Sequence, residues 1–151
     1  MSGELLDIRL KVIGIVRNGI RQRPEPGWRE IVSEIVVDSR LTEALDGLEE
    51  FSHIVVIYWM HQASALGQVP TKIHPRGRQE LPLVGLFATR APHRLNPVGE
   101  TTVRLLERQD NILKVKGLDA IDGTPVIDIK PYLPGRDAIA DAKAPSWVTK
   151  L

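Results

Sequence analysis

The stretch LFATRAPHRLNP, residues 86–97, carries side chains whose types and spacing suit the binding of an anion. Arg90 and Arg94 each present paired N–H donors that fit the two oxygens of a carboxylate or a phosphate. Pro92 and Pro97 restrict the backbone, which lowers the entropy lost when the loop grips a ligand. A loop with a purely structural role is the alternative, and the concentration of arginine and proline favours binding.

A second candidate is the basic loop RQRPEPGWRE, residues 21–30. Gly27 would let a ligand approach the backbone closely, because glycine has no Cβ. Trp28 would offer a flat apolar surface on which a ring could stack. A surface loop that binds nothing explains the same residues, and this segment by itself slightly favours that interpretation.

A third candidate lies where an expected strand, residues 52–61, ends at His61-Gln62. The strand is apolar on both faces, as is typical of a central strand, and polar groups at its end could line the rim of a pocket. A histidine hydrogen-bonded to a loop fits equally well. The four histidines share no metal-ligand spacing and the sequence has no cysteine, so we expect no metal site.

The segment GLDAIDGTPVIDIKPY, residues 117–132, gathers carboxylates beside glycines. In its expected strand, Asp128 and Lys130 are two residues apart and therefore lie on the same face. They could form an exposed ion pair, which contributes little to stability. The carboxylates could equally hold hydroxyl or ammonium groups of a ligand, and the residues alone leave both interpretations open.

We expect strands to position these residues, because the apolar residues along most of the chain follow a period of two. Runs rich in Val and Ile predict strands at residues 11–19, 30–40, 52–61, 81–90, 101–109, 112–119 and 125–132. Only residues 41–51 look helical, residues 62–80 are loop-like, and residues 109–111 predict a hairpin turn. Many short strands without long intervening helices favour a β-barrel or sandwich over a doubly wound α/β sheet.

The composition limits the classes of function. The net charge is +1, so any affinity for nucleic acid must come from a local patch. The common nucleotide-binding and catalytic motifs are missing, and the absence of cysteine excludes thiol catalysis. No apolar run has signal-peptide length near the N-terminus, and the longest one, residues 54–60, is too short to span a bilayer. We expect a soluble, cytoplasmic protein without a membrane segment.

Four motifs together resemble a known family. IGIVRNG (13–19), GLEEFSHIVVIYWMHQ (47–62), VGLFATRAPHRLNPVG (84–99) and LDAIDGTPVIDIKPYLP (118–134) occur in the order typical of the TsaA-like family, also called TrmO or YaeB-like. The resemblance covers about residues 10–137. We therefore expect a single mainly β domain over residues 1–151, with residues 138–151 wrapping its surface.

The resemblance implies a β-barrel, not a Rossmann fold, that binds S-adenosylmethionine and forms a homodimer. Characterised members methylate N6 of a threonylcarbamoyl-modified adenosine next to the anticodon of tRNA. By motif, the implied cofactor contacts fall on Glu25, Pro26, Gly27, His61, Gln62, Arg90, Glu100, Lys116, Gly117, Leu118 and Asp119.

Substrate and catalytic residues are expected beside these cofactor contacts. We expect Arg94 and Lys130 to contact the substrate. A general base would restore the nucleophilicity of N6, and Asp128, His61 and Asp119 are the candidates. Asp128 is our choice, because Lys130 on the same strand face can hold it ionised.

The sequence departs from the family pattern at three places. Leu95 stands where the R-x-N-P step usually has proline, Glu25 stands where glutamine is common, and residues 98–101 read VGET in place of IG-x-S. Glu100 adds a negative charge near the expected cofactor. Larger members carry a C-terminal extension that this sequence lacks, so the resemblance implies the cofactor more directly than the substrate.

Two other functions stay open. A β-barrel that holds S-adenosylmethionine or a nucleotide without catalysis would act as a sensor. A small RNA-binding barrel without a cofactor is the weaker alternative, because it would depend on stacking aromatic side chains and only 5% of the residues are aromatic.

Overall fold

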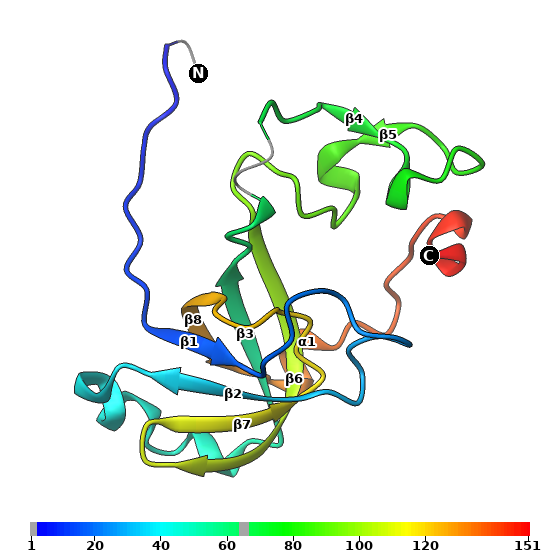
Figure 1. Ribbon diagram of the computed structural model, residues 1–151. Helices are drawn as coiled ribbons and strands as arrows, with labels where there is room; N and C mark the ends of the chain where they lie inside the picture. Colours follow the sequence, from blue (N-terminus) through cyan, green and yellow to red (C-terminus); the bar gives the residue numbers. More distant parts are fainter. Residues whose placement is uncertain (1–2, 64–66) are drawn as a thin grey trace.

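The fold is a closed antiparallel barrel of six strands with a smaller two-stranded sheet beside it (Figure 1). The computed structural model describes residues 3–63 and 67–151. The barrel order is β1-β2-β7-β6-β3-β8, and the strands are β1 (Gly14–Arg17), β2 (Val32–Val37), β3 (His53–Trp59), β6 (Val98–Gln109), β7 (Ile112–Lys116) and β8 (Pro125–Pro131). The predicted mainly β barrel is confirmed.

The core fills the barrel because alternate residues of each strand point inward. In β3, Ile54, Val56 and Tyr58 are buried, while the residues between them are half-buried on the outer face. The same alternation buries Ile35 in β2 and Leu113 in β7. β3 therefore has one buried face and one half-buried face, although its sequence is apolar on both.

The helical expectation at residues 41–51 is confirmed in part, because the segment is helical but does not form one α-helix. The segment folds as two 3-10 helices, η1 (Ser39–Leu45) and η2 (Leu48–Glu50), with Gly47 between them. Gly47 has a φ of 89°, a left-handed conformation that interrupts a right-handed helix. The hairpin turn is confirmed, since Asp110 links β6 to β7 with a φ of 53°.

The expected strand at residues 81–90 is largely wrong. Only β5 (Val84–Gly85) is a strand, and it pairs with β4 (Lys72–Ile73) outside the barrel. The chain then turns into a 3-10 helix, η5 (Leu86–Ala88), because no barrel strand is available to pair with it.

The segment that was expected to be a loop, residues 62–80, contains β4 and a 3-10 turn, η4 (Pro75–Gly77). Residues 64–66 of that segment and residues 1–2 of the expected domain lie outside the described residues.

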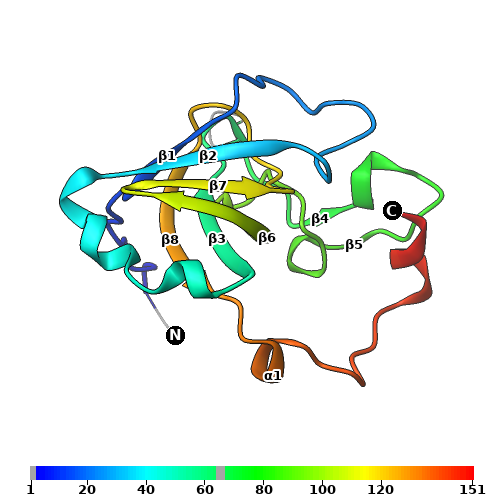
Figure 2. The same cartoon turned by 90° about the horizontal axis from the view of Figure 1, so that it is seen from below.

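The C-terminal segment leaves the barrel after β8 and reaches the small sheet (Figures 1 and 2). It contains a single α-helical turn, α1 (Pro134–Asp137), and a 3-10 helix, η6 (Ser146–Lys150). The guanidinium of Arg78 donates a hydrogen bond to the Lys150 carbonyl, which ties η6 to the chain after η4. In the described residues, no helix has the length and apolar character needed to cross a membrane.

Candidate functional site

A cavity of about 420 Å³ opens where β3 and β6 meet the loop 89–97. Its volume falls in the range typical of small-molecule sites. Four of the residues predicted from the sequence line it together: Arg90, Arg94, Glu100 and Asp119. The cavity therefore joins one end of the barrel to the arginine-bearing loop.

Buried Tyr58 anchors Asp119 at this cavity. Its side chain is 4% exposed, and its hydroxyl donates a hydrogen bond of 2.7 Å to Oδ1 of Asp119. The Thr101 hydroxyl, from β6, donates to the same oxygen. Burial raises the pKa of Tyr58 far above its ordinary value, so the phenol stays protonated and remains a donor. None of the hydrogen bonds among the described residues uses Oδ2 of Asp119.

Gly99 makes room for this arrangement. It pairs with Tyr58 across β3 and β6, and the tyrosine ring lies directly over it. A Cβ at position 99 would overlap the ring. The backbone of β6 must therefore carry glycine here if the phenol is to reach Asp119.

Arg94 stiffens the loop from within. Its Nη1 donates to the carbonyls of Thr89 (2.8 Å) and Ala91 (3.0 Å), and its guanidinium lies 5.9 Å from the ring centroid of Phe87. These contacts fix the backbone on both sides of Arg90. Among the described residues, the guanidinium of Arg90 takes part in no ion pair, and Arg90 lines the cavity. A substrate contact by Arg94 stays a prediction.

The loop 18–31 and the segment after β7 are held together. Lys116 forms an ion pair of 2.7 Å with Glu30, and the Gly117 amide donates to the Ile31 carbonyl. Leu118 is fully buried, so it anchors this segment in the core. Of the expected cofactor residues in this loop, Glu25 and Pro26 are exposed and Gly27 is half-buried.

His61 and Gln62 follow directly after the strand end. The amide of Met60 donates to the Pro97 carbonyl at 2.7 Å, which brings the start of this turn against the loop 89–97. Met60 lines the cavity, whereas His61 and Gln62 are not among its lining residues. Their predicted contact with the cofactor stays a prediction.

Asp128 and Lys130 lie elsewhere. They form an exposed ion pair of 2.8 Å on β8, and this hydrogen bond raises the pKa of Lys130. Asp128 lines a different cavity, beside η2. In the register of the barrel, Ile57 pairs with Asp128 on one side and with Glu100 on the other, a separation of two strand spacings, or about 10 Å. The structure does not bring Asp128 to the cavity that holds Arg90.

Sequence reasoning missed Tyr58, Thr101 and Met60. Tyr58 continues the series of inward-facing residues Ile54 and Val56. The alternation therefore predicts that its side chain, with a polar hydroxyl, points into the barrel. The sequence alone therefore indicates that Tyr58 faces inward. It does not indicate that Asp119 is the hydrogen-bond partner of Tyr58, because that depends on which strands become neighbours. Over residues 3–63 and 67–151, no three His, Asp or Glu side chains are grouped so that they could hold a metal ion.

The sequence profile described as the tRNA-methyltransferase O N-terminal domain matches residues 18–138. The chain belongs to this family. It is 44% identical over 138 residues to a "Probable S-adenosyl-L-methionine-binding protein" of Methanothermobacter thermautotrophicus, covering 89% of this chain and 96% of the relative. It is 36% identical over 145 residues to the "tRNA (adenine(37)-N6)-methyltransferase" of Escherichia coli, covering 87% of this chain and 60% of that protein.

A solved structure, TrmO from P. aeruginosa, superposes on this chain with a TM-score of 0.76 at 32% identity. It matches 95% of this chain, and the chain spans 62% of that protein. The resemblance drawn from the four motifs is therefore confirmed, and so is the barrel fold. The E. coli and P. aeruginosa proteins are therefore longer than the part that this chain matches.

The contact between Gly99 and Tyr58 predicts the effect of a single methyl group. Gly99→Ala should force the ring off Asp119 and destabilise the protein by about 1–3 kcal/mol, as overpacking of a well-filled core does. Chemical denaturation followed by fluorescence measures this change. Gly85→Ala is the matched control, because a Cβ at position 85 meets nothing within 4 Å. Equal stability of the two variants would show that Tyr58 does not need this space.

Proposed function

We propose that this protein transfers a methyl group from S-adenosylmethionine to tRNA, at N6 of the threonylcarbamoyl-modified adenosine next to the anticodon. At the level of the family, the prediction of an S-adenosylmethionine-dependent methyltransferase is confirmed by the names of its relatives. The proposal for this chain rests on one observation. The guanidinium of Arg90 and the carboxylates of Glu100 and Asp119 line the same cavity.

The groups lining this cavity fit the cofactor. S-adenosylmethionine carries a carboxylate, an ammonium, a positive sulfonium and ribose hydroxyls. Arg90 would hold the carboxylate through paired N–H donors, and Glu100 would hold the ammonium. The two carboxylates of the cavity also balance the charge of the sulfonium. A site with cations only, or with carboxylates only, would fit one half of this ligand and repel the other.

When bound, S-adenosylmethionine supplies an electrophilic methyl group, so the chain chiefly has to align the acceptor and accept a proton. The nitrogen N6 of a carbamoylated adenosine is a weak nucleophile until its proton is removed. We assign that task to Asp119, because Tyr58 and Thr101 hold one of its oxygens and leave the other available. The expectation of Asp128 as the base would require an acceptor that reaches the outer face of β8.

A sensor that binds the cofactor without catalysis is the second candidate function. It would use the same cavity, so affinity for the cofactor does not distinguish the two. Transfer of a labelled methyl group from S-adenosylmethionine to tRNA that carries the threonylcarbamoyl modification tests the proposal. A protein that binds the cofactor and leaves such tRNA unlabelled would be a sensor.

Loss of the Arg90 guanidinium should weaken cofactor binding. Arg90→Ala removes a charge-assisted pair worth roughly 1.5–3 kcal/mol, which corresponds to a ten- to hundredfold weaker affinity. Isothermal titration calorimetry with S-adenosylmethionine measures this change, on protein freed of any copurified ligand. Arg104→Ala, an exposed arginine elsewhere on β6, is the control and should bind like the parent. Unchanged affinity of Arg90→Ala would remove Arg90 from the cofactor site.

Isosteric changes of the two aspartates should separate the candidate bases. Asp119→Asn should lower turnover at saturating cofactor by about a hundredfold or more, because the proton acceptor is lost. Asp128→Asn should keep turnover close to that of the parent. Single-turnover methyl transfer to tRNA measures both, and melting temperatures check that both variants fold. The reverse order of effects would restore Asp128 as the base.

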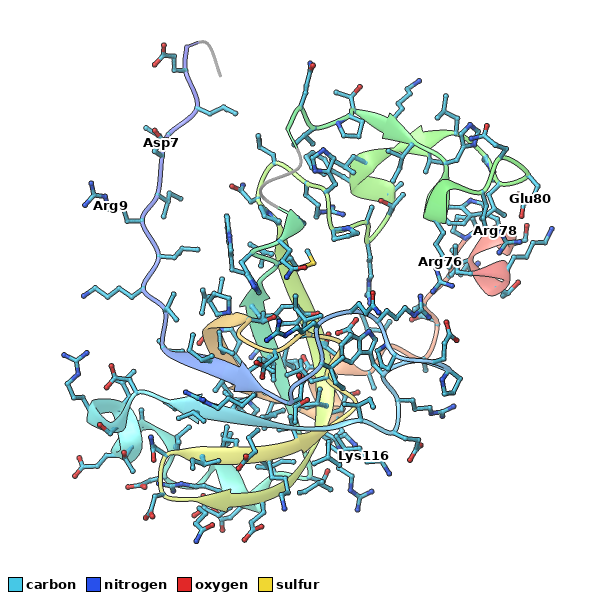
Figure 3. The ribbon with its side chains drawn as sticks, in the orientation of Figure 1. Asp7, Arg9, Arg76, Arg78, Glu80 and Lys116 are labelled. Carbon is cyan, nitrogen blue, oxygen red and sulfur yellow. The ribbon has the colours of Figure 1, made fainter. Side chains whose placement is uncertain are left out.

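We also propose that the protein acts as a homodimer, and the segment before β1 supports this. Residues 4–12 run extended away from the barrel (Figure 1). They expose Leu6, Ile8 and Leu10 at 85%, 80% and 56%, in alternation with the charged Asp7 and Arg9 (Figure 3). An extended apolar segment that pairs with no strand of its own chain invites pairing with another chain.

Two copies of this segment are complementary when they pair antiparallel about Ile8. In that register Leu6 opposes the partner's Leu10, and Asp7 opposes the partner's Arg9. Aliphatic and opposite-charge cross-strand pairs each stabilise a sheet. A shift of one residue would place Leu6 opposite the partner's Arg9 and Asp7 opposite the partner's Ile8, and so would lose the opposite-charge pair.

Charge reversal tests this pairing. Asp7→Arg should weaken the dimer, because two like charges then face each other across the strands. The double variant Asp7→Arg with Arg9→Asp should restore it, and Lys11→Glu, which faces no charge in this register, should change little. Sedimentation or light scattering at micromolar concentration gives the mass. A monomeric parent protein, or a double variant as weak as the single one, would contradict the proposal.

A further inference from the structure

A second cavity, of about 690 Å³, lies on the other side of the loop 89–92. Thr89, Arg90 and Pro92 line both cavities, so the thickness of one loop separates them. The far wall of the second cavity comes from η4 and from η6 of the C-terminal segment. Nothing in the proposed handling of the cofactor uses this space.

Three arginines from three distant parts of the chain surround this cavity: Arg23, Arg76 and Arg90. No aspartate or glutamate side chain lines it. In the described part of the chain, none of the three takes part in an ion pair, whereas Arg40, Arg78 and Arg108 do. Guanidinium groups that face one space without a counter-charge repel one another, and an anion with several oxygens relieves that repulsion.

The backbone presents Arg76 in an unusual conformation. Its φ of 54° and ψ of 23° lie in the left-handed region, which residues other than glycine seldom adopt and which is often retained for function. The turn is held by a hydrogen bond from the Gly77 amide to the His74 carbonyl. Next to it, Arg78 is bonded to the Lys150 carbonyl, and Figure 3 shows Arg76 and Arg78 beside the C-terminal segment. The backbone from which the Arg76 side chain extends is thus held in place by the turn.

The same cavity offers flat apolar surfaces. Phe87 is 84% exposed, with the Arg94 guanidinium on its ring, and Trp147 of η6 lies on the opposite wall. Large aromatic side chains at a cationic groove are the combination that binds single-stranded nucleic acid, because bases stack on the rings while the cations hold the phosphates. An inorganic anion would need the arginines and would leave the rings without a role.

We propose that this cavity binds a nucleotide of single-stranded RNA adjacent to the nucleotide that is methylated. Arg76 and Arg23 hold its phosphate, and Trp147 stacks on its base. Arg90 lies at the wall shared by the two cavities and so links this nucleotide to the cofactor site. The identity of the RNA rests on the proposed function. The preference of this cavity for an RNA strand rests only on the residues that line it.

The test measures RNA binding by the full chain with an anticodon stem-loop oligonucleotide, by fluorescence anisotropy over a range of salt concentrations. Arg76→Gln should weaken binding about tenfold and lower the salt slope by about one phosphate contact. Trp147→Ala should weaken it about five- to hundredfold with little change in the salt slope. Arg104→Gln is the matched control. Calorimetry with S-adenosylmethionine should give the parent's affinity for Arg76→Gln, because Arg76 does not line the cofactor cavity.

RNA affinity and salt slope equal to the parent's in Arg76→Gln and Trp147→Ala would overturn the proposal. The proposal would also be overturned if inorganic phosphate bound the parent protein tightly and an excess of phosphate left RNA binding unchanged. Failure of the proposed function looks different: the parent would bind the stem-loop through Arg76 and still transfer no methyl group to tRNA. Conversely, normal methyl transfer by Arg76→Gln with an unchanged KM for tRNA would refute the pocket and leave the function intact.

Discussion

The hydrogen bond from the buried Tyr58 hydroxyl to Asp119 is the contact on which the site depends. It joins β3 to the segment after β7, two parts of the chain that are 61 residues apart. It requires barrel closure, which places β3 beside β6, and it requires Gly99 at the point where the ring crosses β6. Because the phenol is buried and stays protonated, it holds the carboxylate in one orientation, and a fixed carboxylate is what both ligand binding and proton acceptance need.

The loop 89–97 supplies the opposite charge and depends on its own internal contacts. Arg94 donates through Nη1 to two carbonyls of this loop and so braces it, and its contact with substrate stays a prediction. Arg90, held between these two carbonyls, reaches both cavities. One short, stiff loop therefore separates the cavity proposed for the cofactor from the cavity proposed for an RNA strand. A flexible loop could not serve both, since its position would differ each time a ligand bound.

The sequence predicts the barrel well because inward and outward residues alternate along most strands, and that signal is local. It fails at residues 81–90, where the apolar run has no barrel neighbour. At residues 41–51 it predicts helical structure but not the division into two 3-10 helices at Gly47. The site was predictable only in part. Arg90, Glu100 and Asp119 lie in recognisable motifs, but the place of Asp128 follows from a register across three strands, and the left-handed backbone at Arg76 has no marker in its residue type.

Methyl transfer to tRNA, proposed here for the cavity beside Tyr58, would leave its product among the modified nucleosides of bulk tRNA. Mass spectrometry would compare cells that contain this protein with cells that lack it, and with cells that carry Arg90→Ala. We expect N6-methylated threonylcarbamoyladenosine in cells with the parent protein, and its loss or sharp reduction in the other two. Identical nucleoside profiles in all three would contradict it and leave a protein that binds the cofactor for another purpose.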